Sequence, residues 1–232
     1  MNRLSYLLKN NSNLNIINQY IIYKLKSFFE KRDRKPFVTK YRNFLSTKSL
    51  TQDWFSHNIY DWKKILKSFE DLDFNYLEIG SFEGNSAMFI LKSYQKARVS
   101  CVDAWSQFTK GNEGLPLQIV ENNFNDNLKN FENRVTKIKM KSSNFFLKNK
   151  KKFDIIYIDG SHSADDVFYD CLESWKILNK KGIIIIDDYF WEGYENPLED
   201  PIHGINKFLT ILKKNYLILR VSKYQLFIKK LD

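Results

Sequence analysis

Hydrophobic and polar positions alternate along most of the chain with two different periods. Short apolar runs predict strands over 75–79, 98–102, 135–140, 153–158 and 183–186. The stretches between these runs have helical spacing and predict helices over 85–95, 117–128, 143–148 and 165–178. Because strands that alternate with helices form a parallel sheet covered on both faces, the pattern predicts an α/β fold.

The end of the chain departs from this alternation. A helix is predicted over 205–212, and two adjacent strands follow at 216–221 and 224–228, with Ser222 and Lys223 as their connection. Adjacent strands with so short a connection form an antiparallel hairpin. We therefore predict a Rossmann-like, doubly wound, mostly parallel seven-stranded sheet with one antiparallel edge-hairpin strand.

The first fifty residues precede the alternating pattern and form a separate segment. Four apolar residues recur there at helical spacing and predict an amphipathic helix over 14–30: Ile17, Ile21, Leu25 and Phe28. A basic connector, 31–35, ends at Pro36, and a further helix is predicted over 53–69. We divide the chain into a basic helical N-terminal extension, 1–50, and an α/β domain, 51–232.

The net charge of +10 is concentrated in this extension. Residues 1–50 hold 11 lysines and arginines against two acids, Glu30 and Asp33, whereas the rest of the chain is nearly neutral. A basic arm attracts anionic partners such as a membrane surface or nucleic acid, and the alternative is a solvated helical face. The amphipathic helix can lie on a membrane, pack on the core or join a second copy into a homo-oligomer.

Cysteine content and hydropathy bear on the compartment. Cys101 and Cys171 lie in apolar stretches without metal-ligand spacing. The start of the chain lacks the pattern of a signal peptide, and no early apolar stretch reaches the about 20 residues that span a bilayer. These features predict a cytoplasmic protein, with peripheral membrane contact as an open alternative.

A glycine-containing turn follows the strand predicted at 75–79. The strand carries Glu78, and the turn carries Gly80, Ser81 and Gly84. Glycine lets the backbone approach a ligand closely, and ligands of open α/β sheets bind beyond the carboxyl ends of the strands. The spacing lacks the middle glycine of the nicotinamide fingerprint. Glu78 can act on an ammonium group of a ligand, directly or through water; the alternative is an ordinary strand-to-helix turn.

The ends of the next two strands carry polar residues that suit a nucleoside. Asp103 ends the second strand, 23 residues after Gly80, where an acid can accept hydrogen bonds from both ribose hydroxyls. Ser142 and Ser143 follow the third strand. They can reach an adenine ring or cap the next helix.

Three carboxylates follow the two remaining parallel strands. Asp159 ends the strand at 153–158, and Asp187 and Asp188 end the strand at 183–186. We expect these strand ends to be neighbours, so that the carboxylates converge and require protons or a cation. An oxygen-rich set suits Mg²⁺ or Mn²⁺, which lowers the pKa of a hydroxyl. The alternative is that Asp187 or Asp188 only caps the following turn.

His162 lies three residues after Asp159. Imidazole titrates near neutral pH, so His162 is a candidate general base. The alternative is a structural hydrogen bond in the loop.

At these residues the chain resembles the class I S-adenosylmethionine-dependent methyltransferases, and within them the bacterial group called methyltransferase family 24. The similar segments are 53–59, 77–84, 135–138, 157–162 and 187–189. The resemblance covers about residues 51 to 230. It implies an S-adenosylmethionine site formed by Glu78, Gly80, Ser81, Gly84 and Asp103.

That group is also similar to metal-dependent sugar O-methyltransferases. The similarity implies Mg²⁺ at Asp159, Asp187 and Asp188, and methyl transfer to a small sugar or glycan-type hydroxyl substrate. Those enzymes carry an Asp as base two residues after the first metal ligand, where this chain has Ser161, so we assign the base to His162.

Two other functions stay open. One is a nucleic-acid methyltransferase recruited by the basic arm, which the neutral body and the lack of an Asn-Pro-Pro-Tyr-like motif disfavour. The other is a non-catalytic, cofactor-binding interaction protein.

Overall fold

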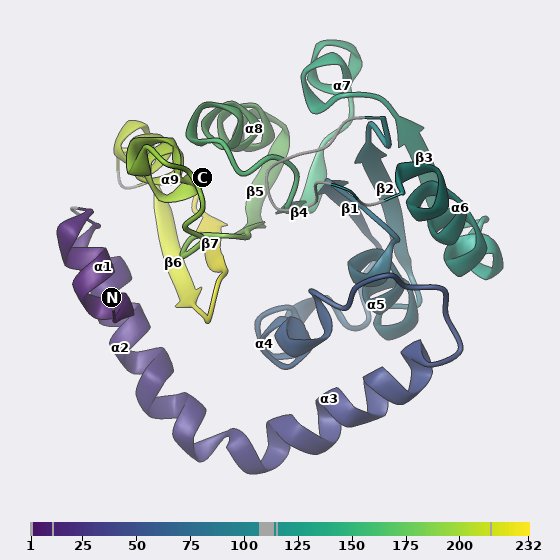
Figure 1. Cartoon of the computed structure of the whole chain (residues 1–232), viewed down its shortest axis with the longest axis horizontal. Helices are drawn as coiled ribbons and strands as arrows, with labels where there is room; N and C mark the ends of the chain where they lie inside the picture. Colours follow the sequence, from purple (N-terminus) through teal and green to yellow (C-terminus); the bar gives the residue numbers. More distant parts are fainter. Residues whose placement is uncertain (1, 11, 107–113, 115, 214) are drawn as a thin grey trace.

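The computed structural model describes residues 2–10, 12–106, 114, 116–213 and 215–232. Seven strands of this part form one sheet in the order β3-β2-β1-β4-β5-β7-β6 (Figure 1). The strands are β1 (Phe74–Ile79), β2 (Ala97–Asp103), β3 (Val135–Lys139), β4 (Phe153–Ile158), β5 (Leu178–Ile186), β6 (Tyr216–Val221) and β7 (Leu226–Lys230). Strands β1 to β5 pair in parallel, and β7 is antiparallel to both β5 and β6. The predicted fold class is confirmed.

The sheet separates two hydrophobic cores because its central strands are apolar on both faces. In β4, Ile156 and Ile158 belong to one core, and Ile155 and Tyr157 belong to the other. The first core is covered by α7 (Ser142–Lys148), α8 (Ala164–Ile177) and α9 (Pro201–Ile211). The second is covered by α4 (Ile59–Ile65), α5 (Asn85–Ser93) and α6 (Leu117–Leu128).

The N-terminal extension passes around the β6 edge of the sheet. It consists of α1 (Arg3–Lys9), α2 (Leu14–Phe29) and α3 (Lys31–Leu45). Helices α1 and α2 contribute to the first core and α3 to the second, with α2 packed along β6 (Figure 1). In the part of the chain that the structure describes, no helix combines the length and the apolar character needed to cross a membrane.

The prediction of a connector at 31–35 is wrong, because these residues begin α3, which continues through Pro36. A proline inside a helix removes one hydrogen bond and is costly, about 3 kcal/mol. Tertiary contacts offset this cost. Val38, Tyr41 and Leu45 are buried on the inner face of α3, and the Arg34 guanidinium pairs with Asp61 at 2.7 Å.

The observed elements differ from the predicted ones in three further ways. The helix predicted over 53–69 is α4 flanked by two 3-10 turns, Ser56–Asn58 and Lys67–Phe69. Strand β5 starts at Leu178, before the strand predicted at 183–186, and includes Gly182. Gly182 is still required there, because a Cβ atom would lie 2.8 Å from the Asp154 carbonyl oxygen. Helix α1 has no counterpart among the predicted elements.

Candidate active site

A cavity of about 910 Å³ opens where β1, β2, β4 and β5 end. The strand order reverses between β1 and β4, and this is the point at which open α/β sheets bind ligands. The volume lies near the upper end of the range of single ligand pockets, so the cavity has room for a cofactor and a small second molecule.

The glycine turn after β1 lies directly against the end of β4. Gly80 has a φ of +84°, and a Cβ atom on it would lie 2.0 Å from the carbonyl oxygen of Asp159. Gly84 has a φ of +77° at the start of α5. Both positions are in the left-handed region, which glycine adopts without strain.

Asp103 fixes this turn from the end of β2. One carboxylate oxygen accepts hydrogen bonds from the backbone N–H groups of Ser81 and Phe82, both at 2.9 Å. The other accepts the N–H of Trp105 at 2.8 Å. Burial raises the pKa of Asp103 against the opposing effect of these backbone hydrogen bonds. The side chain lines the cavity.

The predicted cofactor residues separate into two groups. Gly80, Asp103 and Ser142 line the cavity, whereas Glu78, Ser81 and Gly84 lie behind its wall. Glu78 is fully buried and accepts a hydrogen bond from the Tyr76 hydroxyl at 2.7 Å. Burial raises the pKa of Glu78 to about 7.

The three predicted carboxylates converge at the ends of β4 and β5. The Tyr157 hydroxyl lies 2.7 Å from an oxygen of Asp159 and 2.5 Å from an oxygen of Asp187. The neighbouring carboxylates of Asp187 and Asp188 raise the pKa of Asp159 above its usual range. Burial and Asp188 raise the pKa of Asp187 to about 6. The cluster therefore carries negative charge that a proton or a cation can neutralise.

His162 joins this cluster. Its Nε2 atom lies 2.8 Å from a carboxylate oxygen of Asp188, and its ring stacks on Trp191 with centroids 4.7 Å apart. Asp159, His162 and Asp188 each offer one ligand atom, and these atoms lie within 4.8 Å of one another.

Asp187 is held differently from the other two carboxylates. Its oxygens accept hydrogen bonds from Tyr157, the Gln225 side chain at 2.7 Å and the Asp188 backbone. The structure thus brings His162 together with Asp159 and Asp188, and gives Asp187 partners within the protein. The assignment of Asp187 as a metal ligand stays a prediction.

The cavity wall also contains polar residues that sequence reasoning did not select. At one end, Asp170 lines the cavity beside Ser142, and burial raises its pKa to about 7. At the other end, Lys223, Tyr224 and His57 form part of the wall. A signal for Asp170 existed in the sequence, because it shares the inner stripe of α8 with apolar residues three positions before and one after.

The comparison with protein families agrees with this architecture. Residues 77–189 match the family described as a methyltransferase domain. The uncharacterized protein R132 of Acanthamoeba polyphaga mimivirus is 28% identical over 129 residues, which are 55% of this chain. The match spans little more than half of that relative, 57% of its length.

Solved structures share the fold at low sequence identity. The methyltransferase MycE of mycinamycin biosynthesis, in complex with Mg, SAH and mycinamycin VI, has a TM-score of 0.58 and 15% identity, covering 86% of this chain and 54% of that one. The O-methyltransferase TomG of Streptomyces achromogenes, in complex with SAM, has a TM-score of 0.56 and 12% identity, covering 94% and 99%. An rRNA methylase from Streptococcus thermophilus has a TM-score of 0.55 and 10% identity, covering 79% and 100%.

Proposed function

The chain is a class I S-adenosylmethionine-dependent methyltransferase, and we propose that it methylates a hydroxyl group of a small sugar or glycan-type acceptor. The observation that carries this proposal is the cluster of Asp159, His162 and Asp188 in the wall of the cavity that the Gly80 turn also lines. Such a cluster can bind a hydroxyl group and remove its proton.

The adenosine part of the cofactor occupies the end of the cavity near Asp103 and Ser142. Asp103 would accept a hydrogen bond from one ribose hydroxyl, because its three backbone donors leave one of the about four lone pairs of a carboxylate unused. Asp170 lines the cavity with Ser142 and would accept a hydrogen bond from the exocyclic amine of the adenine. Glu78 lies beneath the turn and acts as a positioning residue for it.

The residues of the cluster fit a divalent cation. Carboxylate oxygens are suitable ligands for Mg²⁺ or Mn²⁺, and the neighbouring carboxylates that raise the pKa of Asp159 indicate negative charge without a full counter-charge. Asp159 and Asp188 would hold the cation, and Asp187 lines the cavity beside them. Such a cation orients an acceptor hydroxyl and lowers its pKa.

The chain's own residues then align the acceptor and accept its proton. The acceptor oxygen attacks the methyl carbon of the sulfonium, so that a C–O bond forms as the S–C bond breaks and S-adenosylhomocysteine leaves. The hydroxyl proton passes to His162, which Asp188 and the stacked Trp191 hold in orientation. Alignment of the reacting atoms supplies much of the acceleration.

Methylation of nucleic acid is the second candidate, because an rRNA methylase shares the fold and the N-terminal extension is basic. The acceptor end of the cavity disfavours it. Asp53, Asp159 and Asp188 line the cavity, and carboxylates repel the phosphates of a nucleic-acid strand.

The test is a methyl-transfer assay on the full chain. The protein is incubated with S-adenosylmethionine and either nucleotide sugars, simple glycosides or RNA, with Mg²⁺ or with a chelator, and S-adenosylhomocysteine is quantified. We expect Mg²⁺-dependent turnover with a sugar acceptor and a methyl ether in the product. Transfer to RNA under both conditions would refute the proposal.

A further inference from the structure

The apolar face of helix α2 continues past the part that packs on the core, and it is exposed toward the end of the helix. Its inner face buries Ile16, Ile17 and Tyr20. Four outward residues, which we call the α2 stripe, are exposed: Ile21, Leu25, Phe28 and Phe29. Spacings of four and three residues put Ile21, Leu25 and Phe28 on one side of the helix. Leu25 is 63% exposed, Phe28 77% and Phe29 78%, so their apolar surface is in contact with water.

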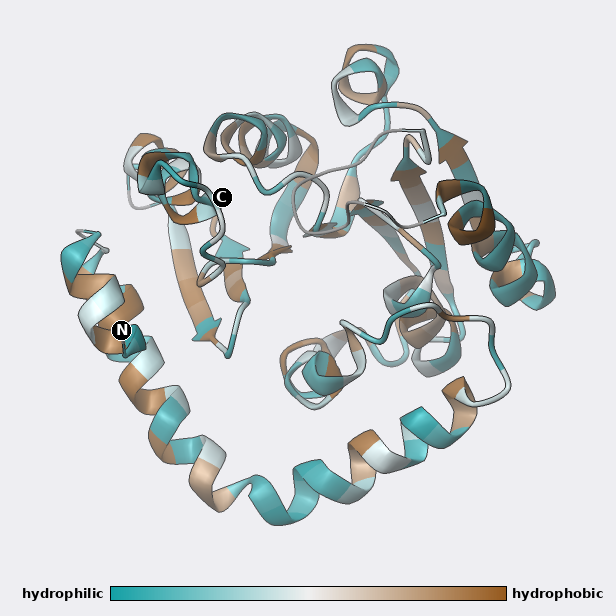
Figure 2. Cartoon of the chain, viewed as in Figure 1, coloured by the Kyte–Doolittle hydropathy of each residue, from teal (hydrophilic) through white to brown (hydrophobic). Residues whose placement is uncertain are grey.

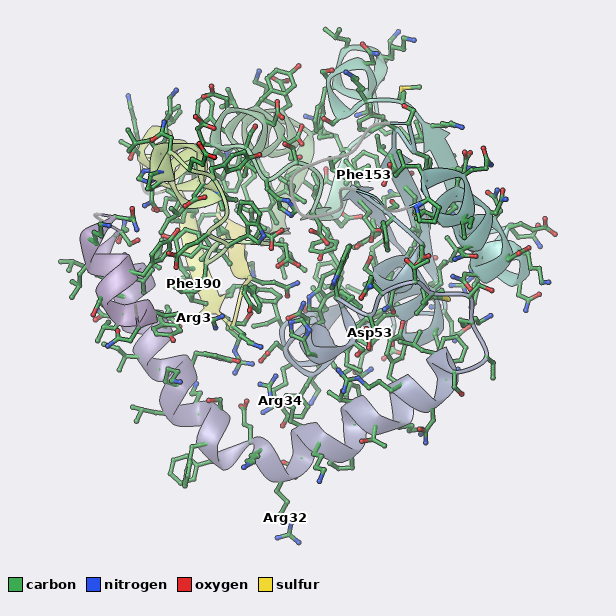
Figure 3. All side chains as sticks on the ribbon, in the orientation of Figure 1. Arg3, Arg32, Arg34, Asp53, Phe153 and Phe190 are labelled. Atoms are coloured by element: carbon green, nitrogen blue, oxygen red, sulfur yellow. The ribbon has the colours of Figure 1, made fainter. Side chains whose placement is uncertain are left out.

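Cations flank this stripe. Five exposed basic residues, which we call the basic flank, lie on α2 and on the start of α3: Lys24, Lys26, Lys31, Arg32 and Lys35. Within the part of the chain that the structure describes, none of the five forms an ion pair. Arg32 points away from the body, whereas Arg34 points toward α4 (Figure 3).

The nearby acids do not neutralise the basic flank. Of the two acids in residues 1–50, Glu30 is directed inward, where it pairs with Arg34, Lys64 and Arg220. Only Asp33 remains among five cations. Figure 2 shows hydrophobic and hydrophilic segments that alternate along α2 and α3. Uncompensated positive charge therefore lies beside the exposed rings of Phe28 and Phe29.

We propose that the α2 stripe and the basic flank dock this protein on an anionic lipid membrane. An apolar face rich in Phe and Leu between lysines and arginines is the composition of helices that lie in a membrane interface. The apolar side chains enter the boundary between headgroups and acyl chains, and the cations contact the anionic headgroups.

The fixed position of α2 and α3 supports this docking. Arg34 and Arg220 both pair with the buried Asp61, and Val38 and Tyr41 of α3 are buried in the second core. The outward face is thus presented by a helix that is already ordered, so that binding requires little loss of conformational freedom.

Charge complementarity favours a membrane over a second copy of the chain. Two copies that met through this face would bring two basic flanks together, and like charges at short distance repel. An anionic lipid surface compensates the same charges. The proposal is independent of the methyl acceptor.

The test uses the full chain and vesicles of two compositions. Flotation is measured with vesicles of phosphatidylcholine alone and with vesicles that also contain phosphatidylserine. We expect binding to the anionic vesicles that weakens as salt is added. Each lysine or arginine near such a surface contributes about fivefold to partitioning, so removal of three charges lowers binding by about a hundredfold.

Two variants test the two components separately. Leu25→Ser, Phe28→Ser and Phe29→Ser together remove the apolar surface, and Lys24→Gln, Lys26→Gln and Arg32→Gln together remove charge. All six side chains are exposed, so we expect unchanged melting temperatures and unchanged binding of S-adenosylhomocysteine. We expect both variants to lose binding to anionic vesicles.

Matched controls come from α7, on another part of the surface. Leu147 is 81% exposed, and Lys148 and Lys150 follow it. Leu147→Ser, Lys148→Gln and Lys150→Gln together should leave vesicle binding unchanged. Equal losses in this control would overturn the proposal, because binding would then depend on overall charge.

A labelled variant reports the position of the stripe directly. Cys101 and Cys171 are both buried, so Phe28→Cys can be labelled selectively with an environment-sensitive dye. A blue shift on addition of anionic vesicles, absent for Leu147→Cys, would support insertion. No binding by the wild type, or a stripe-dependent dimer in sedimentation velocity without vesicle binding, would overturn the proposal.

Discussion

Substitution of Asp103 by Asn tests the cofactor site with little change in volume. In the wild type, three backbone N–H groups, those of Ser81, Phe82 and Trp105, donate to the two carboxylate oxygens. An amide can place its single oxygen toward Ser81 and Phe82 but then directs its own N–H₂ group at the Trp105 N–H. The variant therefore loses at least one hydrogen bond to a charged group, which costs about 1.5–3 kcal/mol.

The same change weakens the predicted contact with the ribose hydroxyls. Loss of one hydrogen bond to a charged group, about 1.5–3 kcal/mol, corresponds to roughly ten- to hundredfold in the dissociation constant. Calorimetric titration with S-adenosylhomocysteine measures this constant for wild type and variant. The thermal midpoint, measured separately, reports the loss at the turn.

Asp154→Asn is the matched control. Asp154 accepts two hydrogen bonds, from the Asn75 backbone at 2.8 Å and the Asn179 side chain at 2.7 Å. It lies near the start of β4, whereas the cavity lies where the strands end. We expect this variant to lose stability and keep its affinity. An Asp103→Asn protein that is folded and binds S-adenosylhomocysteine as tightly as the wild type would refute the ribose assignment.

Three further outcomes follow from the site. The pKa of Glu78 is raised from 4.5 to about 7, so the stability that the protonated side chain contributes is present below pH 4.5 and is lost as the pH rises through 7. Urea unfolding above pH 7 should therefore show that Glu78→Gln is more stable than the wild type by up to about 3 kcal/mol. A stability difference that does not change with pH would contradict this. His162→Gln should lower kcat by about a hundredfold or more with the affinity for S-adenosylhomocysteine unchanged, and unchanged kcat would remove His162 as base. Asp159→Asn should abolish the effect of a chelator on turnover, and an intact chelator effect would place the cation elsewhere.

The sheet was predictable because its strands carry their signal locally. Strand 153–158 is apolar on both sides and agrees at both ends with β4, and the helix at 117–128 agrees with α6. Strand ends followed by acids also located four carboxylates at the cavity: Asp103, Asp159, Asp187 and Asp188. One sequence was enough to predict this arrangement, because the hydrophobic period and the strand order together determine which strand ends lie side by side.

The environment of Asp187 had no such local signal. Its partner Gln225 is 38 positions away and is in turn held by the Trp62 indole N–H at 2.8 Å. Likewise, α3 persists through Pro36 because of contacts with Asp61 and with the second core. Such contacts between distant residues decide which carboxylate oxygens are already engaged by protein donors, and sequence spacing does not contain them.

Ser161 stands where the resemblance to sugar O-methyltransferases predicts an Asp, and its contacts bear on the proposal that His162 is the base. The Ser161 hydroxyl lies 2.7 Å from a carboxylate oxygen of Asp166 and accepts the Ser163 backbone N–H at 3.2 Å. Ser161 thus stabilises the turn into α8, and the next residue is held against Asp188 and Trp191. If this arrangement matters, Ser161→Ala should lower kcat through misplacement of His162, with little effect on the affinity for S-adenosylhomocysteine. Ser161→Asp, which adds a carboxylate beside Asp166, should not restore the activity of His162→Gln; restoration would show that position 161 can itself supply the base.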